Sequence, residues 1–167
     1  EVVKAEFLGD GSRLLTAGVD RRVALWNISE TDSGLALQRI RQFDHEGMVI
    51  SLAVSSLGDR FLSVSRRGEK SSKKVDASKP KTKVTLWTIE SGKEHIVDVT
   101  SQSAASSVSE SARAPVPAWA ANGTLAVVTT PDGIIHFYDS DANRVTNSLR
   151  VDNSDGRRRA LADDFEC

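Results

Sequence analysis

Hydrophobic and polar positions alternate along much of this chain, in short segments that small polar residues and glycines separate. The segment from Val49 to Val54 is largely apolar, a turn follows around Gly58, and Phe61 begins another apolar segment. A further alternating segment runs from Leu35 to Phe43. Short alternating segments bounded by turn residues are typical of β-strands. The pattern therefore predicts an all-β fold.

The strand pattern repeats. Val23–Trp26 and Val84–Trp87 both read Val-x-Leu-Trp, and Ile135–Tyr138 is a related third copy. A glycine precedes the aromatic residue of the first and third copies by fifteen positions, whereas Trp87 arrives fourteen residues later than that spacing. The chain therefore contains three units of one design, and the second carries an insertion. Such units cannot bury their apolar faces alone and must stack on one another.

Three stretches carry a resemblance to the WD-repeat family. DGSRLLTAGVDRRVALWNI is similar to the family pattern throughout, FDHEGMVISLAV resembles the opening of a second repeat, and TLAVVTTPDGIIHFYDS resembles a degenerate third. The resemblance covers about residues 1–140 and implies a partial β-propeller of about three four-stranded antiparallel blades. We expect blades at 1–48, 49–111 and 112–151, a basic insertion at 66–83, and a polar tail or the start of a further blade at 152–167. Because closed propellers have about four to eight blades, we expect the remaining blades in a longer chain.

The family resemblance also implies a buried polar network in each blade. The network joins a His before the first strand, a Ser or Thr in the second strand, an Asp in the next turn and the Trp of the third strand. The matching residues are Thr16, Asp20 and Trp26 in the first unit; His45, Ser63 and Trp87 in the second; and Asp132 and Tyr138 in the third. Asp76 is a poor substitute for the missing Asp of the second unit, and Val128 interrupts the third. We interpret all these residues as structural.

The basic insertion concentrates charge. Residues 66–83 hold eight basic and two acidic side chains, although the whole chain has a net charge of only −1. We expect this loop to emerge beside the turns at Asp20–Arg22 and Asp44–His45 and to meet other proteins, acidic ones in particular. The candidate contact residues are Arg21, Arg22, His45, Arg66, Arg67, Lys70, Lys73 and Lys74. Nucleic acid is disfavoured because the loop has no aromatic residue that could stack on bases. A solvated insertion without a partner is the alternative.

Other chemistry is weakly indicated. Asp139, Asp141 and Asn143 are spaced like the start of a calcium loop, but Arg144 and Arg150 stand where that loop needs Gly and Glu. The three histidines have no metal-ligand spacing, and His136 alternates with apolar residues as a packed histidine would. We expect no catalytic residues, no metal and no cofactor.

Composition gives few further constraints. The single cysteine is Cys167, which fits a reducing compartment and a cytoplasmic protein. No apolar run approaches the ~20 residues that span a bilayer, so we expect no membrane partner. The sequence thus favours a non-catalytic scaffold for protein contacts. The alternative is a regulatory or targeting propeller segment of a larger enzyme, which the full-length gene would reveal through catalytic motifs.

Overall fold

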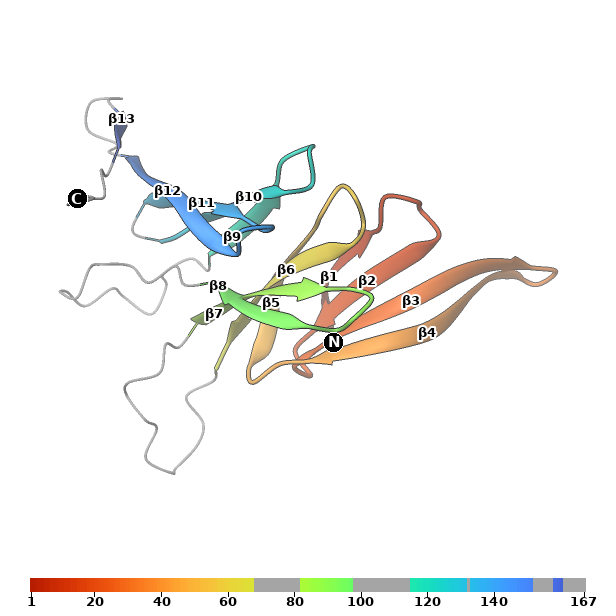
Figure 1. Cartoon of the computed structure of the whole chain (residues 1–167). Coiled ribbons are helices and arrows are strands. Elements are labelled where there is room, and N and C mark those ends of the chain that lie inside the picture. Colours follow the sequence, from red (N-terminus) through yellow and green to blue (C-terminus); the bar gives the residue numbers. More distant parts are fainter. Residues whose placement is uncertain (68–81, 98–114, 132, 152–157, 161–167) are drawn as a thin grey trace, which may run out of the picture.

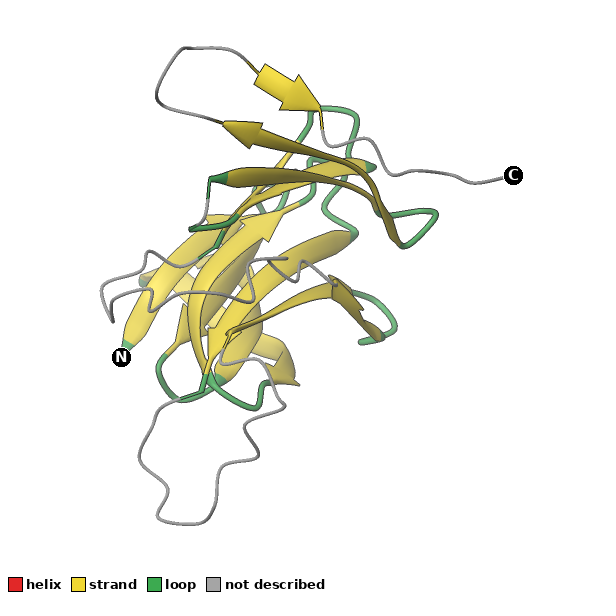
Figure 2. Ribbon diagram, turned by 90° about the vertical axis from the view of Figure 1, so that its left-hand side faces the viewer, coloured by secondary structure: helices red, strands yellow, loops and turns green. Residues whose placement is uncertain are grey.

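The computed structural model describes residues 1–67, 82–97, 115–131, 133–151 and 158–160. Every regular element among these residues is a β-strand (Figure 2). The strands are β1 Val2–Phe7, β2 Arg13–Gly18, β3 Arg22–Thr31, β4 Gly34–Asp44, β5 Met48–Val54, β6 Arg60–Arg66, β7 Thr82–Thr88, β8 Glu94–Val97, β9 Val116–Trp119, β10 Leu125–Thr129, β11 Ile134–Asp139, β12 Arg144–Val151 and β13 Arg158–Ala160.

The strands form three antiparallel sheets, which we call the first, second and third blades. Their orders are β1-β2-β3-β4, β5-β6-β7-β8 and β9-β10-β11-β12, so each blade is a simple meander (Figure 1). The expected all-β fold of three four-stranded blades is confirmed. β13 pairs with β12 as a fifth strand of the third sheet. Within the region expected to be a polar tail or a new blade, Arg158–Ala160 therefore extend an existing blade.

The turn between the first two strands of each blade has the same geometry. Gly11, Gly58 and Gly123 all adopt positive φ, at 69°, 69° and 74°. Glycine takes this conformation without steric cost, which explains its presence at each equivalent turn. Just before two of these glycines, Asp10 and Asn122 accept hydrogen bonds from the main-chain N–H groups two residues on. The three glycines that align the repeats in the sequence therefore occupy equivalent turns in the structure.

Two hydrophobic cores lie between neighbouring blades. The first joins Leu15 and Val23 of the first blade to Phe61 and Trp87 of the second, and these side chains are at most 6% exposed. The second core lies between the second and third blades. It contains Leu62, Val64, Val84, Leu86 and Val97 of the second blade together with Ala126, Val128 and Tyr138 of the third. The second blade is therefore covered on both faces, as radial packing of blades requires.

The residue four positions before each turn glycine shows how a blade covers its predecessor. Val54 packs against the first core. Trp119 packs against the second core and donates its indole N–H to the carbonyl oxygen of Ala53 at 2.9 Å. The equivalent Phe7 in the first blade is 63% exposed. The side chain at this position thus packs against the preceding blade in the second and third blades. In the first blade the equivalent side chain, Phe7, is exposed.

Candidate partner-binding end of the propeller

Loops of the first and second blades meet at one end of the molecule, which we call the pocket end. It comprises the turn before Arg22, the loop Asp44–Gly47 between β4 and β5, and the adjoining ends of β6 and β7 (Figure 1). The main-chain N–H of His45 donates to the carbonyl oxygen of Arg21 at 2.9 Å. Gly47 packs so closely on the main chain of Arg66 that a Cβ atom would not fit. These contacts hold three chain segments to one another.

His45, Ser63 and Trp87 form a hydrogen-bonded network beneath this end. The indole N–H of Trp87 donates to Ser63 Oγ at 3.0 Å, and His45 Nε2 lies 2.8 Å from the same oxygen. His45 Nδ1 lies 3.1 Å from the carbonyl oxygen of Phe43. Since that carbonyl can only accept, Nδ1 carries the proton, and the Ser63 hydroxyl donates to Nε2. The family resemblance implies that these three residues share a buried network, and in the structure they are hydrogen-bonded to one another through Ser63.

Burial keeps His45 uncharged. Desolvation lowers the pKa of its imidazole below the ordinary value of 6.5, and the hydrogen bond that Nδ1 donates to the Phe43 carbonyl oxygen opposes this only in part. The ring also lies 5.1 Å from that of Trp87, in a tilted arrangement. With both nitrogens engaged, His45 serves to hold the loop. This geometry favours its expected structural role over its expected role as a partner contact.

The other blades hold smaller versions of the network. In the first blade the indole N–H of Trp26 donates to Thr16 Oγ1 at 2.8 Å. Asp20 lies in the following turn, with its carboxylate against Gly18. In the third blade Tyr138 makes only a long bond of 3.4 Å to Asn143 Oδ1. Asp76 and Asp132 lie outside the described residues.

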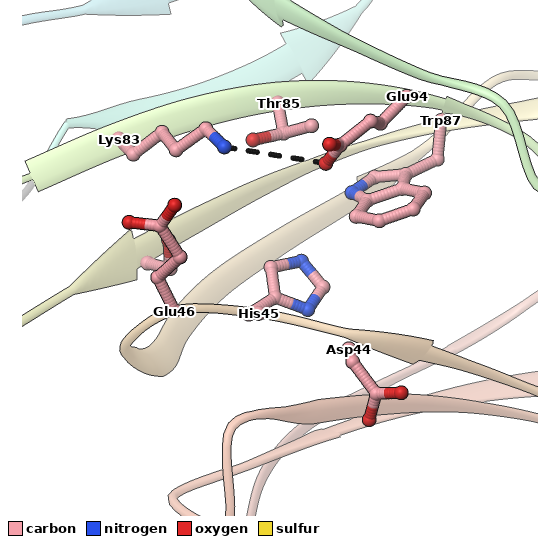
Figure 3. Close-up of a pocket in the computed structure, with 8 residues that line it drawn as sticks. Asp44, His45, Glu46, Lys83, Thr85, Trp87 and Glu94 are labelled. Carbon is pink, nitrogen blue, oxygen red and sulfur yellow. Dashed lines mark ion pairs between the residues drawn. The ribbon is translucent and has the colours of Figure 1, made fainter.

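A pocket of about 280 Å³ opens at this end (Figure 3). Its wall consists of Asp44, His45, Glu46, Ser65, Lys83, Thr85, Trp87 and Glu94. Figure 3 shows the Lys83 ammonium and the Glu94 carboxylate facing each other, and the two atoms are 4.0 Å apart. Asp44 pairs with Arg22 at 3.6 Å, and Glu46 pairs with Arg67. The described part of the pocket end thus pairs acidic with basic side chains.

The predicted contact residues fall into two groups. Arg21 and Arg22 are exposed at the pocket end, and Arg66 and Arg67 lie where β6 ends. Lys70, Lys73 and Lys74 lie outside the described residues. Sequence reasoning missed the acidic side of the pocket. Glu94 reaches it because β8 pairs with β7 in a register that sets Glu94 opposite Trp87, and no local sequence signal marks that pairing.

The calcium-like spacing at Asp139 has a different use. Asp139 Oδ1 accepts hydrogen bonds from the main-chain N–H groups of Asp141 and Ala142, which hold its pKa below the usual value. Asp141 pairs with Arg60 at 2.7 Å and so helps to join the second and third blades. Among the described residues, no group of acidic, His or Cys side chains is arranged to hold a metal ion.

The described portion of the chain contains no helix that is long and apolar enough to cross a membrane.

Comparison with known proteins agrees with this architecture. No family model matches the chain. The structure of U3-55K, a WD40 propeller, superposes with a TM-score of 0.61 over 89% of this chain and 39% of that one, at 16% sequence identity. The fold is a partial β-propeller of three blades.

Sequence relatives point the same way. The chain is 36% identical over 81 residues to the ribosome biogenesis protein ytm1 from two strains of Aspergillus fumigatus, a WD-repeat protein. The alignment covers 45% of this chain and 17% of the relative. The chain therefore spans a small part of the curated relatives it matches. Together the sequence and structural matches support a relationship to the WD-repeat proteins.

Proposed function

We propose that this chain is a non-catalytic propeller segment that presents its pocket end to partner proteins. The locking of loops from two blades is the observation that carries the proposal. The hydrogen bond from His45 to Arg21 and the ion pair between Glu46 and Arg67 fix these loops relative to each other. A partner that spans both loops meets a surface whose shape exists before binding, which reduces the entropy lost on association.

The comparisons suggest a context for such partners. The matched relatives are named for ribosome biogenesis. Because only 17% of their length is aligned, we carry over the context alone, and we propose assembly factors of that process as partners to test first. Further blades of a longer chain remain proposed neighbours. An acidic partner for the basic insertion, and a cytoplasmic location, also remain predictions.

Affinity capture with matched charge variants tests the proposal. Replacing Arg21 and Arg22 by Ser removes two exposed positive charges from the pocket end. Replacing Lys93 and Arg144 by Ser removes two exposed charges from the opposite end of the blades and serves as the control. We expect the first variant to lose captured proteins that the control retains. Equal recovery with both variants would exclude the pocket end as the contact surface.

A third variant separates the basic insertion from the pocket end. It replaces Lys70, Lys73 and Lys74 by Gln and leaves the described loops unchanged. If the insertion binds an acidic protein, this variant loses a partner, and the loss is mimicked by raising the salt concentration, because salt screens exposed charges. If recovery is unchanged at every salt concentration, the insertion has no partner of this kind.

A further inference from the structure

The hairpin between β3 and β4 is longer than the equivalent hairpins of the other two blades. In the first blade Trp26 pairs with Arg39, thirteen positions later. In the other blades the equivalent aromatic residue pairs with a residue only seven positions later; the pairs are Trp87 with Glu94 and Tyr138 with Val145. Three extra residues on each strand lengthen the first hairpin by roughly 10 Å. Figure 1 shows this hairpin reaching beyond the strands of the other two blades.

We call residues 28–37 the hairpin extension, and they form a regular two-stranded ladder. The pairs are Ile28 with Leu37, Ser29 with Ala36, Glu30 with Leu35 and Thr31 with Gly34. At the tip, the Thr31 hydroxyl donates to the Gly34 carbonyl oxygen at 2.7 Å. The second and third blades form their four paired strands without such a segment, so the blade fold does not require it.

One face of the extension presents leucine side chains to solvent. Leu35 and Leu37 are 74% and 56% exposed. Because side chains two positions apart lie on the same face of a strand, both leucines share a face with Arg39, which pairs with Trp26. The adjacent residue Leu25 lies on the other face, in the core shared with the second blade. The exposed leucines therefore point away from the second blade.

A preceding blade of the same design would not cover Leu35. The contact between the first two blades reaches as far as Ile89, two positions after Trp87, which is buried in their common core. Ile28 is the equivalent position in the first blade, and Leu35 lies two pairs farther along the hairpin, opposite Glu30. With the same packing, Leu35 therefore stays exposed when a further blade is added.

The outermost strand β4 also has an open main-chain edge. Among the described residues, β4 pairs with β3 alone. In the second blade the outermost strand, β8, has only four residues, and in the third blade β13 pairs antiparallel with the outermost strand, β12. The eleven-residue β4 is thus a long unpaired edge, which is a template for an added strand. The pairing of β13 shows that a blade of this chain accepts such a strand.

Charge favours an acidic strand at this edge. Arg39 is exposed and has no ion-pair partner among the described residues, and β4 carries no acidic residue before Asp44. Antiparallel pairing of β4 with a second copy, in the register of greatest overlap, would place Arg39 opposite its own copy. Like charges directly opposite each other destabilise a sheet. An acidic residue of another protein is the better neighbour for Arg39.

We propose that β4 receives an extended segment of a partner protein as an added antiparallel strand along residues 34–39. The segment has an acidic residue opposite Arg39 and aliphatic residues two and four positions after it, opposite Leu37 and Leu35. Pairing ends at residue 39 because the extra residue Ile40 interrupts the regular ladder. This site lies at the other end of β3 and β4 from the pocket end, and it does not depend on the proposed function.

Peptide binding to the full chain tests the proposal. The probe is a fluorescein-labelled heptapeptide, Ser-Glu-Thr-Val-Thr-Val-Thr, which has the proposed alternation. One control replaces Glu by Lys, and another, Ser-Glu-Thr-Val-Val-Thr-Thr, keeps the composition but breaks the alternation. In fluorescence anisotropy we expect saturable binding of the probe and binding about threefold weaker for each control. Equal binding of the three peptides, or no binding of the probe, would overturn the proposal.

Amide NMR of the ¹⁵N-labelled full chain locates the bound peptide. An added strand bonds to main-chain N–H groups of β4, so the probe should shift these signals and slow their exchange with solvent. The amide signals of β8 should not change. Shifts confined to the pocket end, around Arg21 and Arg22, would place the peptide there and contradict the proposal.

Two substitutions test the side chains that select the segment. Arg39→Glu should weaken binding of the Glu peptide about threefold and strengthen binding of the Lys peptide by a similar factor. Leu35→Ser should weaken binding of both peptides, whereas Ile96→Ser, at a residue 57% exposed on β8, should change neither. If Arg39→Glu affects both peptides equally, charge does not select the strand and the proposal is wrong.

A hairpin graft tests the site as a whole. Replacing residues 27–38 by the sequence of residues 88–93 gives the first blade a hairpin of the same length as that of the second. We expect urea unfolding to stay close to wild type and binding of the probe to be lost. Binding that survives in the folded graft would place the peptide elsewhere. If sedimentation equilibrium shows a wild-type dimer that the graft abolishes, a second copy occupies β4 and the partner proposal is wrong.

Discussion

Ser63 is the residue on which the network of the second blade depends. Its single oxygen accepts the Trp87 indole N–H at 3.0 Å, and its proton goes to His45 Nε2, which lies 2.8 Å away. Ser63→Ala removes both bonds at once while changing the packed volume very little. The substitution therefore isolates the hydrogen bonds from the hydrophobic contacts around them.

The cost of Ser63→Ala follows from what it leaves unpaired. A buried polar group without a partner costs roughly 1–3 kcal/mol. Trp87 is 6% exposed, so water cannot replace its lost acceptor, whereas half-buried His45 can recover part of its bonding. We expect a total loss of about 2–4 kcal/mol. In the first blade Thr16→Val leaves only the half-buried Trp26 unpaired, and we expect about 1 kcal/mol there.

Equilibrium unfolding in urea measures both free energies. A thermodynamic cycle adds a stricter criterion: in a Trp87→Phe background the indole N–H is already absent, so Ser63→Ala should cost clearly less than it does in the wild type. The reasoning is refuted if Ser63→Ala costs no more than Thr16→Val, or if its cost is the same in both backgrounds. Either result would mean that packing alone holds Trp87 in place.

Three further outcomes follow from the same structure. Gly47→Ala should lower the free energy of unfolding by more than about 2 kcal/mol, since the new Cβ atom would overlap main-chain atoms of Arg66. Gly34 has a φ of 116° and open space around it, so Gly34→Ala should lower the free energy by only about 1–2 kcal/mol. Urea unfolding measures both values. The contribution of His45 to the free energy of unfolding should be complete above pH 6.5 and should decrease as the pH falls through 6.5, because the unfolded chain binds the His45 proton at a higher pH than the folded chain does. Denaturation midpoints at several pH values measure this dependence. His45→Gln should weaken it, and His95→Gln should leave it unchanged. Burial raises the pKa of Tyr138, the only tyrosine in the sequence, to about 12. Ultraviolet absorbance should therefore show its ionisation near pH 12 in the folded chain and near pH 10 in denaturant. The free energy of unfolding should decrease above pH 10, because the unfolded chain loses this proton first.

The repeat was predictable because its signals are local. A glycine in a positive-φ turn and an aromatic residue in the third strand can each be recognised from a few neighbouring residues of the sequence. Gly11 and Gly123 therefore predict the register of two blades, and in the structure both adopt similar positive φ angles, 69° and 74°. The bond between Trp26 and Thr16 follows from the same register, since β2 and β3 are neighbours in one meander.

The pocket was not predictable for the opposite reason. Glu94 and Lys83 meet only when β8 pairs with β7, and Glu46 joins them from a loop that belongs to the preceding connection. Charge counting over residues 66–83 also gave an incomplete picture. It indicated a basic surface, but Arg67 pairs with Glu46 in space, so the described edge of the insertion is balanced. Pairing across blades is a property of the assembled sheets.

The second blade is packed on both faces, against a different neighbour on each side. Leu62 and Val64 face the third blade, while Phe61 and Trp87 face the first, so the sheet is held from both sides. The tight turn that places Asp20 against Gly18 in the first blade is replaced by the insertion in the second. The pocket lies beside the point where the insertion leaves β6 and enters β7.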